Sequence, residues 1–166
     1  MFDGWKLCPR CGNQLTHGAE VVECGACGFF LYAHSAVTAS ALPEDDEGRV
    51  LLARRRVEPW RDRWDLVGGF LAEGEHPLDG LRREVLEETG LEFEPDRFLG
   101  VWMGDYDGRA TLNPIWTGRV EAGELHAADD VSQLRWFGAD ALPDPGELAF
   151  DGLVAEILRA WRNEHA

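Results

Sequence analysis

The pattern of apolar and polar positions divides the chain into short strands and two helices. Runs rich in apolar and β-branched residues, bounded by glycine, proline and acidic residues, are typical of strands. Strands are predicted on this basis at residues 35–42, 50–54, 64–70, 98–102, 110–120 and 132–137. The turn at 43–48 joins the first two of these strands, so the chain should open its main domain with a β-hairpin.

The middle of the chain carries the clearest helical pattern. Leu78, Leu81 and Val85 recur at helical spacing and would form a buried stripe. Proline is favourable at the first position of a helix, and glycine is the commonest residue just beyond its end. The pattern therefore predicts a helix from Pro77 to Thr89, capped by Gly90.

A second helix is predicted at the C-terminal end, over residues 148–161, where Leu153, Ile157 and Trp161 share one face. Strands flanked by a middle and a terminal helix indicate the α/β class and an α/β/α sandwich with a mixed sheet. A chain of 166 residues suffices for one such domain and a small appendage.

Candidate chemistry lies on the middle helix. Glu84, Glu87 and Glu88 stand at i, i+3 and i+4, so their carboxylates are expected to converge on one side. Three like charges at that spacing repel one another unless cations lie between them. Mg²⁺ and Mn²⁺ prefer oxygen ligands of this kind, shared with phosphates. The alternative is a solvated acidic helix with pairs such as Arg83 and Glu87.

The stretch from Gly69 to Leu91 reads Gly-x5-Glu-x7-Arg-Glu-Val-x-Glu-Glu-x-Gly-Leu. It resembles, without a mismatch, the signature box of the Nudix hydrolases. The resemblance implies a Nudix-type sandwich and a Mg²⁺-dependent pyrophosphohydrolase that cleaves a phosphoanhydride bond in a nucleoside diphosphate linked to another moiety. One departure is Val67, where the family commonly has proline before the two glycines.

Within this box the residue types suggest separate roles. We expect Glu87 and Glu88 to coordinate Mg²⁺ or Mn²⁺ directly, and Glu84 to be a further ligand or to orient the attacking water. The Gly69 carbonyl can supply another oxygen ligand, because glycine allows the backbone to approach closely.

Two further sets of charged residues belong to the candidate catalytic site. Arg83 is expected to pair with Glu75 and so to hold the loop against the helix. Many Nudix proteins add a carboxylate from a loop well after the box, and the resemblance assigns this role to Asp130, with Asp129 and Glu124 as alternatives. An acidic surface turn is the other reading of that loop.

Cysteines at the N-terminal end indicate a second metal site. Cys8, Cys11, Cys24 and Cys27 follow the spacing C-x2-C-x12-C-x2-C, and each pair is followed by glycine. Four thiolates at this spacing predict a closed, structural Zn²⁺ site. Two disulfides are the alternative, and the paired spacing and an expected cytosolic context disfavour them.

The two motifs predict two domains, a zinc ribbon at residues 1–32 and a Nudix hydrolase domain at residues 33–166. A ribbon before a Nudix box resembles NADH pyrophosphatases and related members that act on ADP-ribose or flavin dinucleotides. The NADH pyrophosphatases carry Ser-Gln-Pro-Trp-Pro-Phe-Pro after the box, and nothing similar occurs between Gly100 and Val120. ADP-ribose, FAD or a similar dinucleotide is therefore expected as substrate more than NADH.

The composition limits which classes of molecule the protein is expected to bind. A net charge of −15 makes nucleic acid and anionic membranes poor partners. The partner that the resemblance implies is a small-molecule nucleotide substrate. The chain has neither a long apolar run nor a signal-peptide pattern, which predicts a cytoplasmic protein. Because ribbon-bearing relatives are often dimers, a homodimer is left open. The rival hypothesis is a catalytically silent Nudix-fold adaptor whose ribbon docks a partner.

Aromatic side chains near the box are candidates for stacking on a substrate base. Phe70, Trp102, Tyr106 and Trp116 qualify by their position in the sequence. Packing in the core is the competing interpretation for each of them.

Overall fold

A computed structural model describes Phe2 and residues 4–164 of the chain. Contacts divide the chain into two compact units, Met1–Ser35 and Ala36–Ala166. The first unit contains a small antiparallel sheet with the order β1-β2-β3. Its strands are β1 (Thr16–His17), β2 (Val21–Glu23) and β3 (Phe30–Tyr32).

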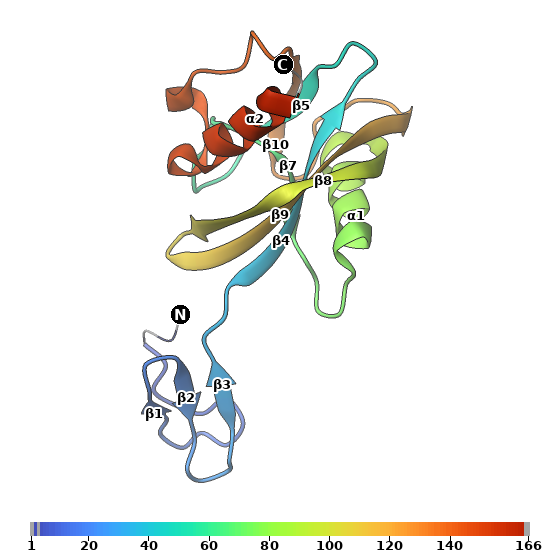
Figure 1. The fold of residues 1–166 in the computed structure, drawn as a ribbon. Helices are drawn as coiled ribbons and strands as arrows, with labels where there is room; N and C mark the ends of the chain where they lie inside the picture. Colours follow the sequence, from blue (N-terminus) through green and yellow to red (C-terminus); the bar gives the residue numbers. More distant parts are fainter. Residues whose placement is uncertain (1, 3, 165–166) are drawn as a thin grey trace. The chain divides into compact units, whose positions relative to one another are not determined.

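The second unit is built on a seven-stranded sheet (Figure 1). Its strands are β4 (Ala36–Glu44), β5 (Val50–Arg55), β6 (Trp64–Asp65), β7 (Val67–Phe70), β8 (Leu91–Tyr106), β9 (Arg109–Gly123) and β10 (Val131–Phe137). The order along the sheet is β10-β5-β4-β9-β8, with β6 paired to β5 and β7 paired to β4. Only β4 and β9 run parallel, so the sheet is mixed, as predicted.

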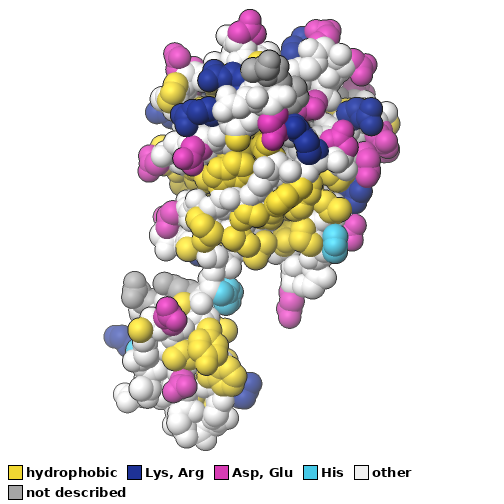
Figure 2. Space-filling model, viewed as in Figure 1, with side chains coloured by type: hydrophobic (Ala, Val, Ile, Leu, Met, Phe, Trp, Pro, Cys, Tyr) yellow, Lys and Arg dark blue, Asp and Glu magenta, His cyan; other side chains and the backbone are white. Residues whose placement is uncertain are grey.

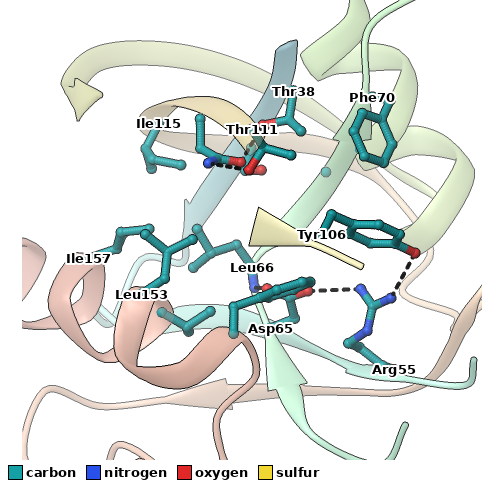
Figure 3. A pocket seen from close by; sticks show the side chains of 16 residues that line it. Thr38, Arg55, Asp65, Leu66, Phe70, Tyr106, Thr111, Ile115, Leu153 and Ile157 are labelled. Atoms are coloured by element: carbon teal, nitrogen blue, oxygen red, sulfur yellow. Dashed lines mark hydrogen bonds and ion pairs between the residues drawn. The ribbon is translucent and has the colours of Figure 1, made fainter. Parts of the chain in front are cut away.

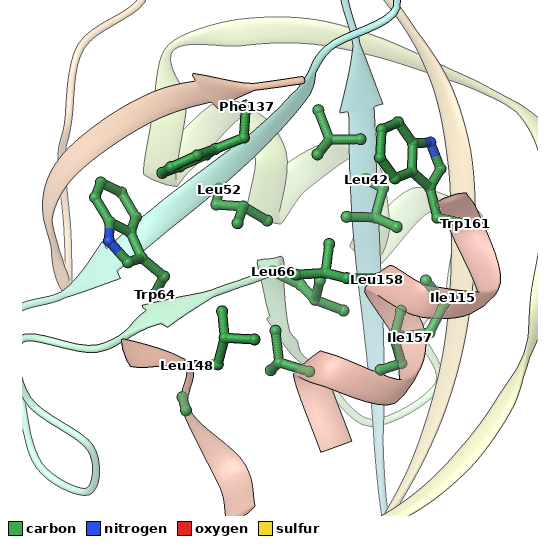
Figure 4. Close-up of a cluster of buried hydrophobic side chains, with 13 residues drawn as sticks. Leu42, Leu52, Trp64, Leu66, Ile115, Phe137, Leu148, Ile157, Leu158 and Trp161 are labelled. Atoms are coloured by element: carbon green, nitrogen blue, oxygen red, sulfur yellow. The ribbon is translucent and has the colours of Figure 1, made fainter. Parts of the chain in front are cut away.

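The two helices lie on opposite faces of this sheet (Figure 1). Helix α1 (Pro77–Thr89) covers one face, where Leu81 and Val85 are fully buried against Ala39, Leu51 and Val67. Helix α2 (Leu153–Glu164) covers the other face through Val154, Ile157, Leu158 and Trp161 (Figure 4). The predicted α/β/α sandwich is confirmed. In the described part of the chain, no helix has the length and apolar character needed to cross a membrane.

Local signals in the sequence explain why α1 has the predicted bounds. His76 precedes the helix in an extended conformation, and its Nδ1 accepts a hydrogen bond from the Leu78 amide at 3.3 Å. Pro77 occupies the first turn, where its missing N–H costs nothing. Gly90 ends the helix in the left-handed conformation, and its N–H donates to the Leu86 carbonyl at 2.9 Å.

The C-terminal helix begins later than the sequence pattern predicts. Two 3-10 turns, η1 (Pro145–Glu147) and η2 (Phe150–Gly152), precede α2. Phe150 and Asp151 both have left-handed backbone angles, with φ of 59° and 44°. A right-handed helix cannot pass through such residues, so it starts only at Leu153.

Two predicted strands also differ from those observed. The run at 64–70 divides at Leu66 into β6 and β7, because its two halves pair with different neighbours. Strand β8 extends well beyond the predicted 98–102 and continues through Pro95. Among the described residues β8 pairs only with β9, and an edge strand tolerates proline because one side needs no ladder hydrogen bonds.

Candidate active site

The three acidic side chains of helix α1 differ in how deeply they are buried. Glu84 and Glu88 face the sheet, with 13% of the Glu84 side chain and 6% of Glu88 exposed. Glu87 points outward, and 51% of its side chain is exposed. The three carboxylates therefore differ in burial, although one arginine nitrogen contacts both Glu84 and Glu87.

The two inward acids pack against the glycine pair at the end of β7. The Gly68 amide donates a hydrogen bond to Glu88 Oε2 at 2.9 Å. A β-carbon on Gly69 would lie only 2.6 Å from Glu84 Oε2, so any larger residue would displace that carboxylate. Glycine at this position lets the carboxylate lie directly against the backbone.

Arg83 links the helix to the loop that precedes it. Its Nε and Nη2 donate to the two oxygens of Glu75 at 2.8 and 2.9 Å, so the predicted ion pair is present. Its Nη1 also donates to Glu84 Oε1 at 2.7 Å and to Glu87 Oε2 at 3.0 Å. The hydrogen bonds from Arg83 lower the pKa of Glu75 to about 2. One guanidinium thus holds three carboxylates.

The inward acids lie in an unfavourable environment for negative charge. Burial raises the pKa of Glu88 well above its ordinary value of 4.5, and the charges of Asp130, Asp65 and Glu84 act in the same direction. Burial also raises the pKa of Glu84, against the opposing effect of Arg83, and Asp129 adds to the increase. Without a cation, the site is strained electrostatically.

The late loop reaches this site. The negative charges of Asp129 and Asp130 contribute to the raised pKa values of Glu84 and Glu88, respectively. For Glu124 the contact is made by the backbone carbonyl, which lies 2.8 Å from His126 Nδ1 within the same loop. The amide of Ala128, which precedes Asp129, donates to the Glu88 carbonyl at 3.1 Å and so brings this loop to the end of α1.

A cavity of about 80 Å³ opens next to the glycine pair (Figure 3). Its floor is polar: Thr38 Oγ1 donates to Asn113 Oδ1 at 2.9 Å, and Asn113 Nδ2 donates to Thr111 Oγ1 at 3.0 Å. Thr38 and Thr111 are both buried. Phe70, the direct strand partner of Thr38, and Tyr106 also line the cavity, with their rings edge to face at 5.3 Å. The cavity combines hydrogen-bonding groups with aromatic rings, as ligand sites do.

One cation lines this cavity, and it is held on several sides. Arg55 Nη1 donates to Asp65 Oδ2 at 3.0 Å, and Arg55 Nε donates to the Pro59 carbonyl at 2.7 Å. The guanidinium also lies over the rings of Tyr106 and Phe150, at 5.7 and 5.2 Å from their centroids. Burial raises the pKa of Asp65 although Arg55 opposes this effect.

Sequence patterns predicted only part of this cavity. Of the four candidate aromatic residues, Phe70 and Tyr106 line it, whereas Trp116 packs on the α1 side of the sheet and Trp102 against the α2 core. Arg55, Asp65 and Phe150 were missed. The one available signal was that Arg55 and Asp65 are charged residues within strands that flank the box.

The four cysteines of the first unit form a compact cluster. Their sulfurs all lie within 4.8 Å of one another, and in the described part of the chain no other group of three or more metal-ligating residues is this close. The Cys8–Cys27 and Cys11–Cys24 sulfur distances are 3.6 and 3.5 Å, and the thiols are free. Tetrahedral Zn²⁺ with bonds of about 2.3 Å would place its sulfurs about 3.8 Å apart.

The pKa values of the cysteine thiols are also consistent with a metal site. The Asn13 side chain donates to Cys11 Sγ and lowers the pKa of that thiol to about 6. The Phe29 amide favours the Cys27 thiolate, but burial and the neighbouring sulfurs outweigh it and raise the pKa of Cys27 to about 12. A bound metal ion would stabilise all four thiolates, so that none of the cysteines would need to keep its proton.

The acids of α1 fit a hard divalent cation by their chemistry. They supply several carboxylate oxygens beside a backbone carbonyl, and their raised pKa values show that nearby positive charge would stabilise them. Their oxygens are less closely grouped than the cysteine sulfurs, because Arg83 and the Gly68 amide each hold some of them.

Comparison with known proteins agrees with this geometry. A family model described as the NUDIX domain matches residues 34–157. An ADP-ribose pyrophosphatase of Methanocaldococcus jannaschii is 34% identical over 137 residues, which cover 80% of this chain and 78% of that protein.

Two further proteins are less similar in sequence. One is matched over about half of its length, and the other has the same fold. A NAD-capped RNA hydrolase of Vibrio atlanticus is 27% identical over 158 residues, and the match spans 87% of this chain but only 53% of the relative. A crystal structure of a NUDIX hydrolase from Nitrosomonas europaea superposes with a TM-score of 0.82 at 22% identity, covering 96% of this chain and 92% of that one. This likeness supports the fold.

The buried charge at Glu88 generates a prediction about stability and pH. Because burial raises the pKa of Glu88, its ionised form lowers stability at neutral pH, and this cost disappears below the ordinary value of 4.5. Glu88→Gln should therefore raise the melting temperature of metal-free protein at pH 7. The gain should shrink as the pH falls toward 4.5.

Differential scanning calorimetry in the presence of a chelator measures this effect. Glu87→Gln is the matched control, since that side chain is half exposed and its replacement should change the melting temperature little. A lower melting temperature for Glu88→Gln at pH 7 would contradict the assignment of Glu88 as an electrostatically strained group.

Proposed function

The chain belongs to the Nudix hydrolase family, and we propose that it hydrolyses a nucleoside diphosphate linked to another moiety in a Mg²⁺-dependent reaction. ADP-ribose, FAD or a similar dinucleotide is the proposed substrate class. The observation that carries the proposal is the pair of buried acids, Glu84 and Glu88, held against Gly68 and Gly69 beside an open cavity. Buried carboxylates with raised pKa values are expected where a protein binds cations for catalysis.

We assign the metal ligands to Glu84, Glu87, Glu88 and the Gly69 carbonyl. Glu87 already shares Arg83 Nη1 with Glu84, and its exposed position would let it turn toward a metal ion. Mg²⁺ or Mn²⁺ held there would neutralise the diphosphate and acidify a water molecule. Arg83 and Glu75 keep the loop and the helix together, so that the acids retain their directions.

The reaction is the attack of a water oxygen on phosphorus, with cleavage of the bond from phosphorus to the bridging oxygen. The proton released from water passes to a carboxylate of the site. Glu84 and Asp130 are the candidates for this acceptor.

We propose that the cavity receives the nucleoside part of the substrate. Phe70 and Tyr106 offer ring faces and edges to a base, while Thr38, Thr111 and Asn113 offer hydrogen bonds from the floor. Arg55 adds a positive charge at the cavity wall of a strongly acidic chain. Nucleotides present a planar base and negative phosphates, which match these two features.

The choice of ADP-ribose or FAD over NADH is supported by two facts. The chain lacks the Ser-Gln-Pro-Trp-Pro-Phe-Pro motif between Gly100 and Val120. The relative that is 34% identical bears the name ADP-ribose pyrophosphatase. The relatives named for NAD-capped RNA are longer than this chain and are matched at lower identity.

We further propose that the first unit binds one structural Zn²⁺ through Cys8, Cys11, Cys24 and Cys27 and forms a zinc ribbon. We place the boundary between ribbon and hydrolase domain near residues 32–35. Four protein ligands leave no open position on the metal, so its role is folding of the unit and not catalysis. A cytoplasmic location follows from this proposal, because free thiols persist in reducing compartments.

Self-association is a further proposal, supported by the surface of the second unit. Apolar side chains gather on the face over β8 and β9, with charged side chains around them (Figure 2). Phe98, Val101 and Met103 of β8 are each more than half exposed. Exposed apolar groups on an edge strand are typical of surfaces that pair with another chain, and a second copy is the partner we propose.

Activity should require both the metal and the acids. With Mg²⁺, the protein should release mononucleotide from at least one member of a panel of ADP-ribose, FAD, NAD(H), NAD-capped RNA, diadenosine polyphosphates and nucleoside triphosphates. Replacing Glu87 and Glu88 together with glutamine should reduce kcat by at least about 100-fold, because both proposed ligands are lost. Chromatography of the products measures the rate.

The same double variant separates the enzyme from the adaptor hypothesis, because an adaptor would retain partner binding. Glu92→Gln, at an exposed acidic residue of β8, serves as the control and should leave activity unchanged. Failure of metal-loaded protein to turn over any compound of the panel would contradict the proposed activity.

Zinc content tests the proposal for the cysteines. Purified protein should contain about one Zn²⁺ per chain by mass spectrometry, as a four-thiolate site requires. Replacing Cys8 and Cys27 with serine should abolish this content, whereas Asn13→Ala, which removes a hydrogen bond to Cys11 but no ligand, should preserve it. Two disulfides and no bound metal in protein purified under mildly reducing conditions would contradict the assignment.

A further inference from the structure

The loop from Glu124 to Asp130 is fastened to α1 by backbone hydrogen bonds. The His126 amide donates to the Thr89 carbonyl at 3.0 Å, and the Ala128 amide donates to the Glu88 carbonyl at 3.1 Å. The last carbonyls of a helix lack partners within the helix, so these bonds satisfy groups that need them. The far end of the loop is held by the Arg56 amide, which donates to the Asp130 carbonyl at 2.7 Å.

The His126 ring lies directly over the end of α1. A β-carbon on Gly90 would lie 2.2 Å from His126 Cε1, so the ring occupies the space that any other residue at 90 would need. His126 Nδ1 and the Glu124 carbonyl are 2.8 Å apart, which fixes the orientation of the ring. Position 90 therefore requires glycine for two reasons, its left-handed φ of 72° and the close contact with the His126 ring.

Both residues of the contact between His126 and Gly90 lie close in the sequence to candidate acids. Thr89 and Gly90 directly follow Glu88 in the helix, and Asp129 and Asp130 follow His126 by three and four residues. Asp129 itself has a left-handed φ of 49°, a conformation that its surroundings must maintain. A shift of the loop would therefore move both aspartates relative to Glu84 and Glu88.

We propose that His126 is a positioning residue, which seats its ring on Gly90 and thereby keeps Asp129 and Asp130 beside Glu84 and Glu88. The inference rests on the proposed function, because it assigns the late loop to the same cation site. His126 itself contacts neither the substrate nor the proposed metal ligands. Its effect passes through the two backbone hydrogen bonds to α1.

The test compares His126→Ala with Leu125→Ala, a neighbouring exposed side chain of the same loop. Removing the ring should increase amide hydrogen exchange at Ala128 by about tenfold, because its bond to Glu88 opens more often. It should also weaken Mn²⁺ binding, measured by calorimetry without substrate, by about tenfold, because the loop acids are no longer held in place. Leu125→Ala should change neither quantity.

His126→Phe provides a rescue, since a planar ring can again cover Gly90 and should restore much of the protection at Ala128. In turnover assays His126→Ala should lower kcat with little change in KM, as expected when ligands are misplaced but the substrate cavity is intact. Equal exchange and equal Mn²⁺ affinity in the His126→Ala and Leu125→Ala proteins would overturn the proposal. Exchange and Mn²⁺ binding can be measured even if no substrate is found, so failure of this inference is distinguishable from failure of the proposed function.

Discussion

Repulsion between buried carboxylates is the constraint on which the rest of the site depends. Glu88 is almost fully buried, and its pKa is raised by that burial and by the charges of Asp130, Asp65 and Glu84. A protein gains no stability from such an arrangement, so the groups around it must hold the acids in place. The Gly68 amide does this for Glu88, and Arg83 does it for Glu84.

The fold supplies these supports from separate elements. The end of β7 brings the glycine pair against α1, and the loop before β10 returns over the C-terminal end of the same helix. Strands β5 and β6 add Arg55 and Asp65 at the adjoining cavity. Acids, cavity and positive charge thus meet where strand ends and one helix come together, which suits the cleavage of a charged, extended nucleotide.

Local sequence signals predicted both ends of α1 to the residue, because Pro77 and Gly90 act within one turn of their own positions. They also identified the ion pair of Arg83, whose partner is eight residues away. The floor of the cavity could not be predicted this way, because Thr38 and its partner Asn113 are 75 residues apart and meet only through the sheet. The exposure of Glu87 was missed for a different reason, since helical spacing alone does not show how deeply each side chain is buried against the sheet.

The central claim is that these acids are held together in order to bind divalent cations. Titration of the carboxyl carbons by NMR, with and without Mg²⁺, measures it at Glu88 directly. In metal-free protein the pKa of Glu88 should lie well above its ordinary 4.5, and it should fall when Mg²⁺ is added. A pKa for Glu88 that does not respond to Mg²⁺ or Mn²⁺ would contradict this claim.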